Sequence, residues 1–474
     1  MTNVVSKEAV LAVDYLKNSF RKVEYDSRIT NTTYDFHYPV TGTRNTTCLR
    51  WVIPRSGGNR VPNIEKLVLA MDLKCTNAAK DKRPPVDIAA APTNNFANSI
   101  FGCLTISYNN TVVCKIDNYP IYNYLSLILN NSENDFKTWA ATRLFYKEEE
   151  DEELDDAETK TWLKRRLCLG GPITKPKTIK SKGPEGEEIE IPNPDLGKFQ
   201  YGDKPVFFVS SLDHYLETPA LLSDCDIHVQ LDLSKSGYAF HSKDQTPANC
   251  DIAVDIERAR LFVPQMTLND QLYTQLKNRL SKEPMRQFYT STMVNTHTIS
   301  TGDKTAVFSS ICQGMSPNRV YIMLQESDRY QGQFDLNKLK FPRVYNAKSD
   351  PFMLQKASMK LNSVDIDPLS CDDAGSFRDE YFRLMSLTNQ DVGKNSCSIT
   401  FKNFLEHNCI LVYDLTATMN QSEPPLVPLT HKGHLRLKLE FDKATTCSLT
   451  LIVVAECSSS LTIEDSGKVT VATL

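Results

Sequence analysis

Residues 98–147 read NSIFGCLTISYNNTVVCKIDNYPIYNYLSLILNNSENDFKTWAATRLFYK, and this stretch decides the fold. Residues 100–108 and 111–114 are rich in apolar, β-branched and aromatic side chains, and Asn109-Asn110 separates the two runs. Such residues favour strands, and a short polar break between two strand-like runs is typical of a hairpin. The stretch therefore predicts two antiparallel strands joined by a tight turn.

A helix is predicted to follow this hairpin directly. Asp117 or Asn118 can act as its N-cap, and Pro120 fits the first turn, where a missing N–H needs no partner. One apolar stripe with the spacing of a helix face runs along it, formed by Ile121, Leu125 and Ile128. None of these signals is catalytic, so the stretch indicates a packed structural unit.

The order of these pieces resembles the major capsid protein of Polinton (Maverick) elements and of adintoviruses. Residues 108–111 (YNNT), 118–122 (NYPIY) and 144–148 (LFYKE) stand where that family has a short turn, an NTYPYRAY-like segment and an LFYKD-like segment. This chain departs from the family pattern at Ile121, Tyr122 and Glu148, where the family has Tyr, Arg and Asp.

Segments further along the chain resemble the same family. Residues 253–263 and 319–324 are similar to two of its strands, and residues 433–441 and 448–465 are similar to its carboxy-terminal strands. Residues 448–456 are apolar on both faces, which predicts a central, buried strand. The resemblance spans nearly the whole chain and implies an all-β fold with short helical insertions, built of two consecutive eight-stranded jelly rolls.

The pattern and the resemblance together divide the chain into an arm and two rolls. We expect an amino-terminal arm at residues 1–24, a first jelly roll at 25–245 with a long charged insertion at 147–200, and a second jelly roll at 246–474. A chain of 474 residues is indeed too long for one ordinary core. Strand-like alternation restarts at Ala253, which we interpret as the start of the second roll.

Three segments near these boundaries have clear periodicity. An amphipathic helix in the arm is predicted from Ala9, Val13, Leu16 and Phe20; it either docks on its own sandwich or reaches a neighbouring subunit or the inner capsid surface. A strand is predicted where aromatic and polar residues alternate, at Tyr34, Asp35, Phe36, His37 and Tyr38. A helix with Thr267 as its cap is predicted from Leu268, Leu272, Leu276 and Leu280.

Composition excludes several classes of protein. Only 18 of 474 residues are Gly, and we find no glycine-rich phosphate-binding motif and no nucleophile elbow. The net charge of −4 argues against a protein whose main task is coating nucleic acid but leaves a local basic patch open, and we expect no sequence-specific nucleic-acid binding. The 13 Cys residues form no C-x-x-C pair, so we expect reduced, packed thiols made in a reducing compartment. No window is apolar enough for a membrane span, and the first residues lack a signal peptide's apolar core.

An acidic run opens the charged insertion. It consists of Glu148, Glu149, Glu150, Asp151, Glu152, Glu153, Asp155, Asp156 and Glu158. A run of like charges followed by Pro- and Gly-rich sequence predicts a long exposed loop, because such a segment buries too little apolar area to offset its ordering entropy. A divalent-cation site is the alternative, although consecutive like charges usually stay solvated.

The candidate catalytic and metal-binding residues do not form a site. His431 and His434 lack a neighbouring carboxylate or thiol at zinc-ligand spacing. Asp213-His214 lacks a nucleophile motif, and Cys225 and Cys409 lie in apolar runs typical of inert thiols. Residues 363–367 and 371–373 lack the spacing of a calcium loop and are interpreted as turns. We therefore predict no catalytic residue, no metal, no cofactor and no enzyme activity.

The resemblance implies a viral major capsid protein that forms pseudo-hexagonal homotrimers tiling an icosahedral shell. Its partners would be neighbouring capsomers and penton or minor capsid proteins. It would be made in the host cytoplasm and reside in the virion capsid, with assembly in either nucleus or cytoplasm. Two alternatives stay open at this point. One is a carbohydrate-binding or hydrolytic β-sandwich, which shares the jelly-roll architecture, and the other is a minor or vertex capsid protein.

Overall fold

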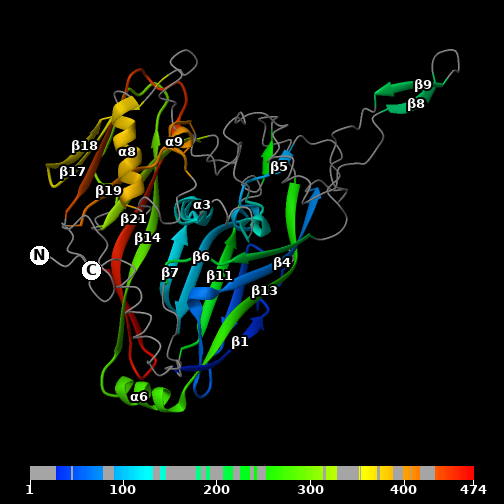
Figure 1. Ribbon diagram of the computed structural model, residues 1–474, viewed down its shortest axis with the longest axis vertical. Coiled ribbons are helices and arrows are strands. Elements are labelled where there is room, and N and C mark those ends of the chain that lie inside the picture. The colour runs from blue at the N-terminus through cyan, green and yellow to red at the C-terminus, as the bar shows by residue number, and fades with distance from the viewer. Residues whose placement is uncertain are drawn as a thin grey trace, which may run out of the picture.

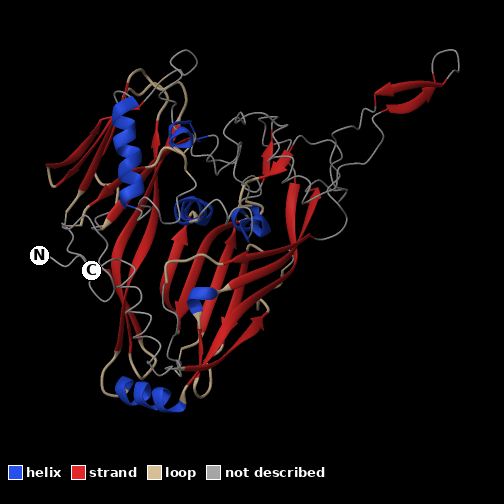
Figure 2. Cartoon of the chain, in the orientation of Figure 1, coloured by secondary structure: helices blue, strands red, loops and turns tan. Residues whose placement is uncertain are grey.

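The structure is a computed structural model of the 474-residue chain. It describes residues 28–43, 46–77, 90–131, 139–145, 178–182, 188–192, 206–216, 225–234, 240–242, 252–312, 317–327, 352, 354–370, 374–387, 399–406, 408–416 and 433–473. Strands dominate these residues, and they gather into two β-sandwiches that stand side by side (Figures 1 and 2). We call them the first and the second sandwich.

The first sandwich consists of two antiparallel sheets. One sheet has the order β1-β13-β4-β10, with β3 also paired to β13: β1 (Ile29–His37), β13 (Ile252–Leu268), β4 (Val68–Asn77), β10 (Val206–Ser211) and β3 (Arg60–Pro62). The other has the order β2-β11-β6-β7: β2 (Cys48–Ile53), β11 (Ile227–Leu233), β6 (Phe101–Tyr108) and β7 (Thr111–Asp117). Alternating inward residues such as Trp51, Leu104 and Val229 fill the space between the two sheets.

The second sandwich repeats the same strand order. One sheet is β14-β21-β16-β19, with β22 also paired to β21: β14 (Met285–Ile299), β21 (Leu449–Ile463), β16 (Arg319–Glu326), β19 (Leu411–Asp414) and β22 (Val469–Thr473). The other is β15-β20-β17-β18: β15 (Thr305–Phe308), β20 (Leu435–Phe441), β17 (Leu354–Leu361) and β18 (Val364–Ser370). Each strand of the second sandwich thus has a counterpart at the same place in the first.

Short helices and two small pairs of strands lie outside the four main sheets. The α-helices are α2 (Phe96–Ser99), α3 (Tyr119–Asn130), α6 (Asp270–Leu280), α8 (Ala374–Leu387) and α9 (Phe401–Glu406), and the 3-10 helices are η1 (Ile64–Lys66) and η2 (Trp139–Arg143). Two further antiparallel pairs are β5 (Ala90–Pro92) with β12 (Phe240–Ser242), and β8 (Thr178–Lys182) with β9 (Glu188–Pro192). Figure 1 shows α6 crossing from the first sandwich to the second at one end of the molecule, and α3 lying between the sandwiches.

The hairpin and helix predicted from residues 98–147 are confirmed as β6, β7 and α3. Asn109 and Asn110 have φ angles of 44° and 69°, the left-handed conformation that a tight two-residue hairpin turn requires and that Asn tolerates. Asn118 occupies the N-cap position of α3, but it has a φ of 54° and its side chain makes no capping hydrogen bond. The predicted side-chain cap at this position was therefore wrong, although the position of the helix start was right.

The strand predicted to open the second jelly roll instead completes the first. β13 pairs with β1, β3 and β4, so residues 252–268 belong to the first sandwich and the second begins with β14. The boundary expected at residue 246 therefore shifts to α6. Alternation reveals a strand but not its partners, which depend on contacts distant in sequence.

The helix α6 also begins later than expected. Its N-cap is Asn269, whose side chain accepts a hydrogen bond from the backbone N–H of Gln271, and not Thr267. Leu268, predicted to lie on the helix, is the last residue of β13. Asn is at least as good a cap as Thr, and the pairing of Thr267 and Leu268 with β1 keeps both residues in β13.

Two predicted loops contain strands. Residues 363–367, interpreted as a turn, supply only Ser363 to a turn, and from Val364 they form β18. The charged insertion at 147–200, expected to be one long loop, contains the hairpin of β8 and β9. The acidic run from Glu148 to Glu158 and the arm at residues 1–24 lie outside the described residues.

The two predicted cores are both present. One contains Leu49, Ile106, Leu231 and Leu261 from the first sandwich, and the other contains Met323, Leu437 and Val453 from the second. β21 lies between β14 and β16 and is buried on both faces along residues 449–455, which confirms the central position predicted for it.

Substituting Val453 tests the burial of β21. Val453 is 0% exposed, so Val453→Asp places a carboxylate in an apolar core at a cost of several kcal/mol and is expected to abolish soluble expression. The matched control is Val307→Asp on the edge strand β15, where the side chain is 46% exposed. Equal soluble yields of the two variants would contradict the central position of β21.

Candidate functional site at the junction of the two sandwiches

The helix α3 belongs to the first half of the chain, yet its apolar stripe packs into the second core. Ile121, Leu125 and Ile128 join the cluster that also holds Val320 and Leu411. The three stripe residues are those predicted from the sequence, but the sequence did not reveal that they bury against the other sandwich. The stripe therefore joins the two halves of the chain.

Residues of the second half enter the first core in return. Tyr289 of β14, Leu461 and Ile463 of β21, and Val469 of β22 belong to the cluster that contains Val113 of β7. The lower parts of β14 and β22 thus contact the edge strand β7 of the first sandwich, and β21 joins them through Leu461 and Ile463 (Figure 1). We call the contact of β7 and α3 with the second sandwich the junction.

Polar contacts fix the register of the junction. The hydroxyl of Tyr289 donates to the carbonyl of Val113 at 3.2 Å, and its ring stacks on Tyr215 at 5.9 Å. The amide of Asn109 donates to the carbonyl of Gly467 at 2.8 Å. The hydroxyl of Tyr124 on α3 donates to Oδ1 of Asn408 at 3.2 Å. A buried polar group without a partner costs free energy, so these bonds favour one alignment of the two sandwiches.

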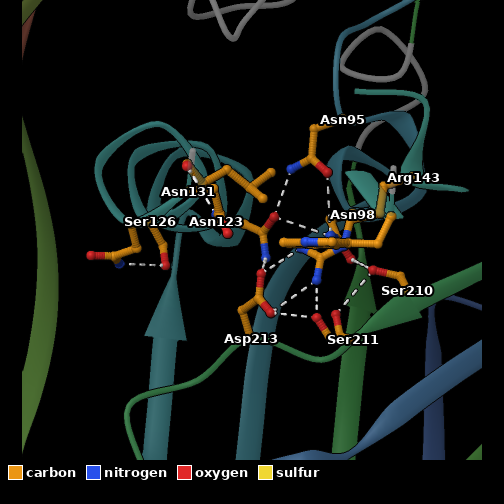
Figure 3. Close-up of polar contacts among 12 residues, drawn as sticks. Asn95, Asn98, Asn123, Ser126, Asn131, Arg143, Ser210, Ser211 and Asp213 are labelled. Atoms are coloured by element: carbon orange, nitrogen blue, oxygen red, sulfur yellow. Dashed lines mark hydrogen bonds and ion pairs between the residues drawn. The ribbon is translucent and has the colours of Figure 1, made fainter. Parts of the chain in front are cut away.

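A buried polar cluster anchors α3 to the first sandwich. We call it the Arg143 cluster; its members are Asn95, Asn98, Asn123, Arg143, Ser210, Ser211 and Asp213 (Figure 3). The guanidinium of Arg143 is completely buried and lies 2.6 Å from Oδ2 of Asp213. It also donates to Oγ of Ser211 and lies over the ring of Trp139, 4.5 Å from its centroid.

Asn123 links this ion pair to the rest of the cluster. Its side-chain amide donates to Oδ2 of Asp213 at 2.8 Å. Its oxygen accepts from Asn95 at 2.6 Å and from Asn98 at 3.0 Å. Because these residues come from α2, α3, η2 and the end of β10, the cluster holds four elements in one arrangement. α3 is thus bound through Asn123 to the first sandwich and through its apolar stripe to the second.

The Arg143 cluster could not be predicted from local sequence patterns. Its members are scattered from residue 95 to residue 213, and Asn, Ser, Asp and Arg are usually solvated. Asp213 was noted only with His214 as a rejected catalytic pair. The structure separates the two roles: Asp213 pairs with Arg143, whereas His214 contacts the carbonyl of Ile64 at 2.9 Å and burial lowers its pKa.

Two of the remaining sequence candidates are thiols, and His431 lies outside the described residues. Cys225 and Cys409 are buried, as predicted for packed thiols, and the described cysteines form no disulfide. Burial raises the pKa of Cys114 and of Cys312 to about 12, which keeps both thiols protonated and unreactive. His434 precedes β20, and within the described ranges no group of three or more His, Cys, Asp or Glu could hold a metal ion.

Known structures match this chain in fold, whereas no family model and no curated protein matches its sequence. Solved structures do match over nearly its whole length. A chain of the Sputnik virophage aligns with a TM-score of 0.60 at 11% identity, covering 100% of this chain and 93% of that one.

Two major capsid proteins align in the same way. The Faustovirus major capsid protein has a TM-score of 0.56 at 9% identity and covers 93% of this chain and 92% of its own. The mavirus major capsid protein has a TM-score of 0.50 at 11% identity, with coverage of 100% and 96%. This chain is a double jelly roll. Each sandwich is one jelly roll, and among the described residues no helix is long and apolar enough to cross a membrane.

Removing the charge of Arg143 tests whether the Arg143 cluster anchors α3. Arg143→Met leaves Asp213 without its buried partner and is expected to lower the free energy of unfolding by about 3 kcal/mol, the low end for a broken buried pair, because the Asp213 side chain is 23% exposed. Chemical denaturation measures this change.

The matched control is Lys115→Met, which breaks an ion pair of 3.1 Å with Asp117 in which both side chains are more than half exposed. Such surface pairs contribute roughly 0–1 kcal/mol. If Arg143→Met destabilises the protein no more than Lys115→Met does, the cluster does not anchor α3.

Proposed function

We propose that this protein is a viral major capsid protein whose homotrimers form pseudo-hexagonal building blocks of an icosahedral shell. The observation that supports this most strongly is the repetition of one strand order in two jelly rolls that stand side by side. Three such chains around a threefold axis present six similar blocks, and six similar blocks have the outline needed to tile a flat face. The likeness to the Faustovirus and mavirus major capsid proteins supports the same function.

The finer assignment rests on the sequence resemblance. Residues 108–111, 118–122 and 144–148 are similar to the capsid proteins of Polinton elements and adintoviruses. On this proposal the protein is not an enzyme and acts through its surfaces. Its partners are other copies of the chain, neighbouring capsomers and penton or minor capsid proteins. It is made in the host cytoplasm and resides in the virion capsid.

Light scattering after size exclusion tests the proposal. The expected result is a stable species near three times 53.6 kDa, which electron microscopy shows as particles with a six-lobed outline. A strictly monomeric protein at all concentrations would contradict the capsid function and would fit the carbohydrate-binding or hydrolytic sandwich instead. A pentamer would indicate a vertex protein.

We further propose that the acidic run tunes assembly. If the residues from Glu148 to Glu158 of different subunits approach one another around the threefold axis, they repel over about 8–10 Å at physiological salt. Trimers should then be more stable at about 500 mM salt than at about 50 mM.

The control replaces residues 148–158 with Gly and Ser, which removes the charge but keeps the length. Trimer dissociation is measured by light scattering on serial dilution at each salt concentration. An unchanged salt dependence in this variant would show that the acidic run projects into solvent and has no part in assembly.

A further inference from the structure

The elements of the first sandwich that build the junction have a second copy in the chain. The β6–β7 hairpin turns through Asn109 and Asn110, and the β17–β18 hairpin turns through Asn362 and Ser363, with φ angles of 48° and 76° at the second turn. A helix follows each hairpin: α3 follows β7 and α8 follows β18. The second hairpin and α8 together therefore match the inserting side of the junction, and we call them the second inserting face.

The receiving side of the junction is also present twice. Within the chain it consists of β14, β21 and β22, of which β14 and β22 contact β7. The corresponding strands of the first sandwich are β1, β13 and β3, joined in the same order. Figure 1 shows β18 on the side of the second sandwich that faces away from the first, α8 packs against β18 and β19, and the main contacts of β1 are with β13 and β2 of its own sandwich. One inserting face and one receiving face are therefore left over.

The second inserting face exposes apolar side chains at positions where the corresponding residues of the first make junction contacts. Thr111, the first residue of β7, donates through its hydroxyl to the carbonyl of Val469, but Val364, the first residue of β18, is 69% exposed. The side chain of Phe382 on α8 is 68% exposed, whereas the stripe of α3 is buried. Tyr381 and Leu384 of α8 pack against the second core, so Phe382 lies on the opposite side of the helix.

The left-over receiving face exposes an aromatic row. Tyr34 is 62% exposed, and Phe36 and Tyr38 are each 57% exposed. The Phe36 ring lies 6.0 Å from Tyr38 and 6.4 Å from Phe262 of β13, so these three rings are neighbours and the patch extends onto the next strand. Among the described strands β1 pairs with β13 alone and is the edge of its sheet. An exposed aromatic patch on a sheet edge is a recognised docking surface.

We propose that the second inserting face of one copy docks on the aromatic row of another copy, as β7 and α3 dock on β14, β21 and β22 within the chain. The contact joins two different surfaces, Val364 and Phe382 on one copy and Tyr34, Phe36 and Tyr38 on the next. It is heterologous, so each copy offers both surfaces and a ring can close. This inference rests on the proposed homotrimer and names the surfaces that hold it together.

Two variants each disrupt one of the two proposed contact surfaces. The row variant carries Tyr34→Ser, Phe36→Ser and Tyr38→Ser, and the inserting variant carries Val364→Ser and Phe382→Ser. All five side chains are exposed, so we expect each variant to keep the melting temperature of the monomer and to run near 53.6 kDa by light scattering. The control Val307→Ser removes an exposed apolar side chain from β15, at the sheet edge opposite β18, and should remain trimeric.

Mixing the two variants tests whether the contact joins two different surfaces on neighbouring copies. The row variant keeps an intact inserting face and the inserting variant keeps an intact row, so an equimolar mixture should form a species near twice 53.6 kDa that neither variant forms alone. A mixture that remains monomeric would overturn the pairing of these two surfaces. A contact of the row with itself would instead leave the inserting variant fully assembled.

Hydroxyl-radical footprinting of the wild-type oligomer provides a readout that needs no variant. Tyr34, Phe36, Tyr38 and Phe382 should be oxidised several-fold more slowly in the oligomer than in protein diluted to monomers, and Val307 should be unaffected. Equal oxidation in both states would overturn the inference. A wild-type trimer that tolerates both sets of substitutions would also overturn it while leaving the proposed function intact, whereas a monomeric wild type would overturn both.

Discussion

The burial of α3 between two sandwiches is the constraint on which the rest of the structure depends. Asn123 holds the helix to the Arg143 cluster of the first sandwich, and Ile121, Leu125 and Ile128 place its apolar stripe in the second core. A first sandwich without the second would expose this stripe and the edge of β7, an arrangement that favours aggregation. The helix therefore couples the two sandwiches through one set of polar contacts and one apolar stripe.

The repetition of strand order links this pair of sandwiches to its proposed function. The strands of the second sandwich pair in the same order as those of the first. A contact that forms between the sandwiches within one chain therefore has the geometry to form between two chains. Among the described residues no group of three or more His, Cys, Asp or Glu could hold a metal ion, and burial raises the pKa of thiols such as Cys114. On the proposed function the protein acts through the fit of its surfaces.

Local signals predicted much of the fold, and long-range pairing explains most of the errors. The turn at Asn109-Asn110, the stripe of α3 and the doubly apolar β21 are each specified within about fifteen residues, so the sequence alone located them. β13 was assigned to the wrong roll because alternation carries no information on partners. The aromatic residues of β1 predicted a strand but not that Phe36 faces outward, and the Arg143 cluster brings together residues that each look solvated in isolation.

The most direct test of this account is an electron cryomicroscopy reconstruction of the purified oligomer at side-chain resolution. The account predicts three copies around a threefold axis, with β18 and α8 of each copy against β1 of the next and with six sandwiches in similar contacts around the ring. A ring in which β1 faces solvent, or a twofold assembly in which identical surfaces meet, would contradict it.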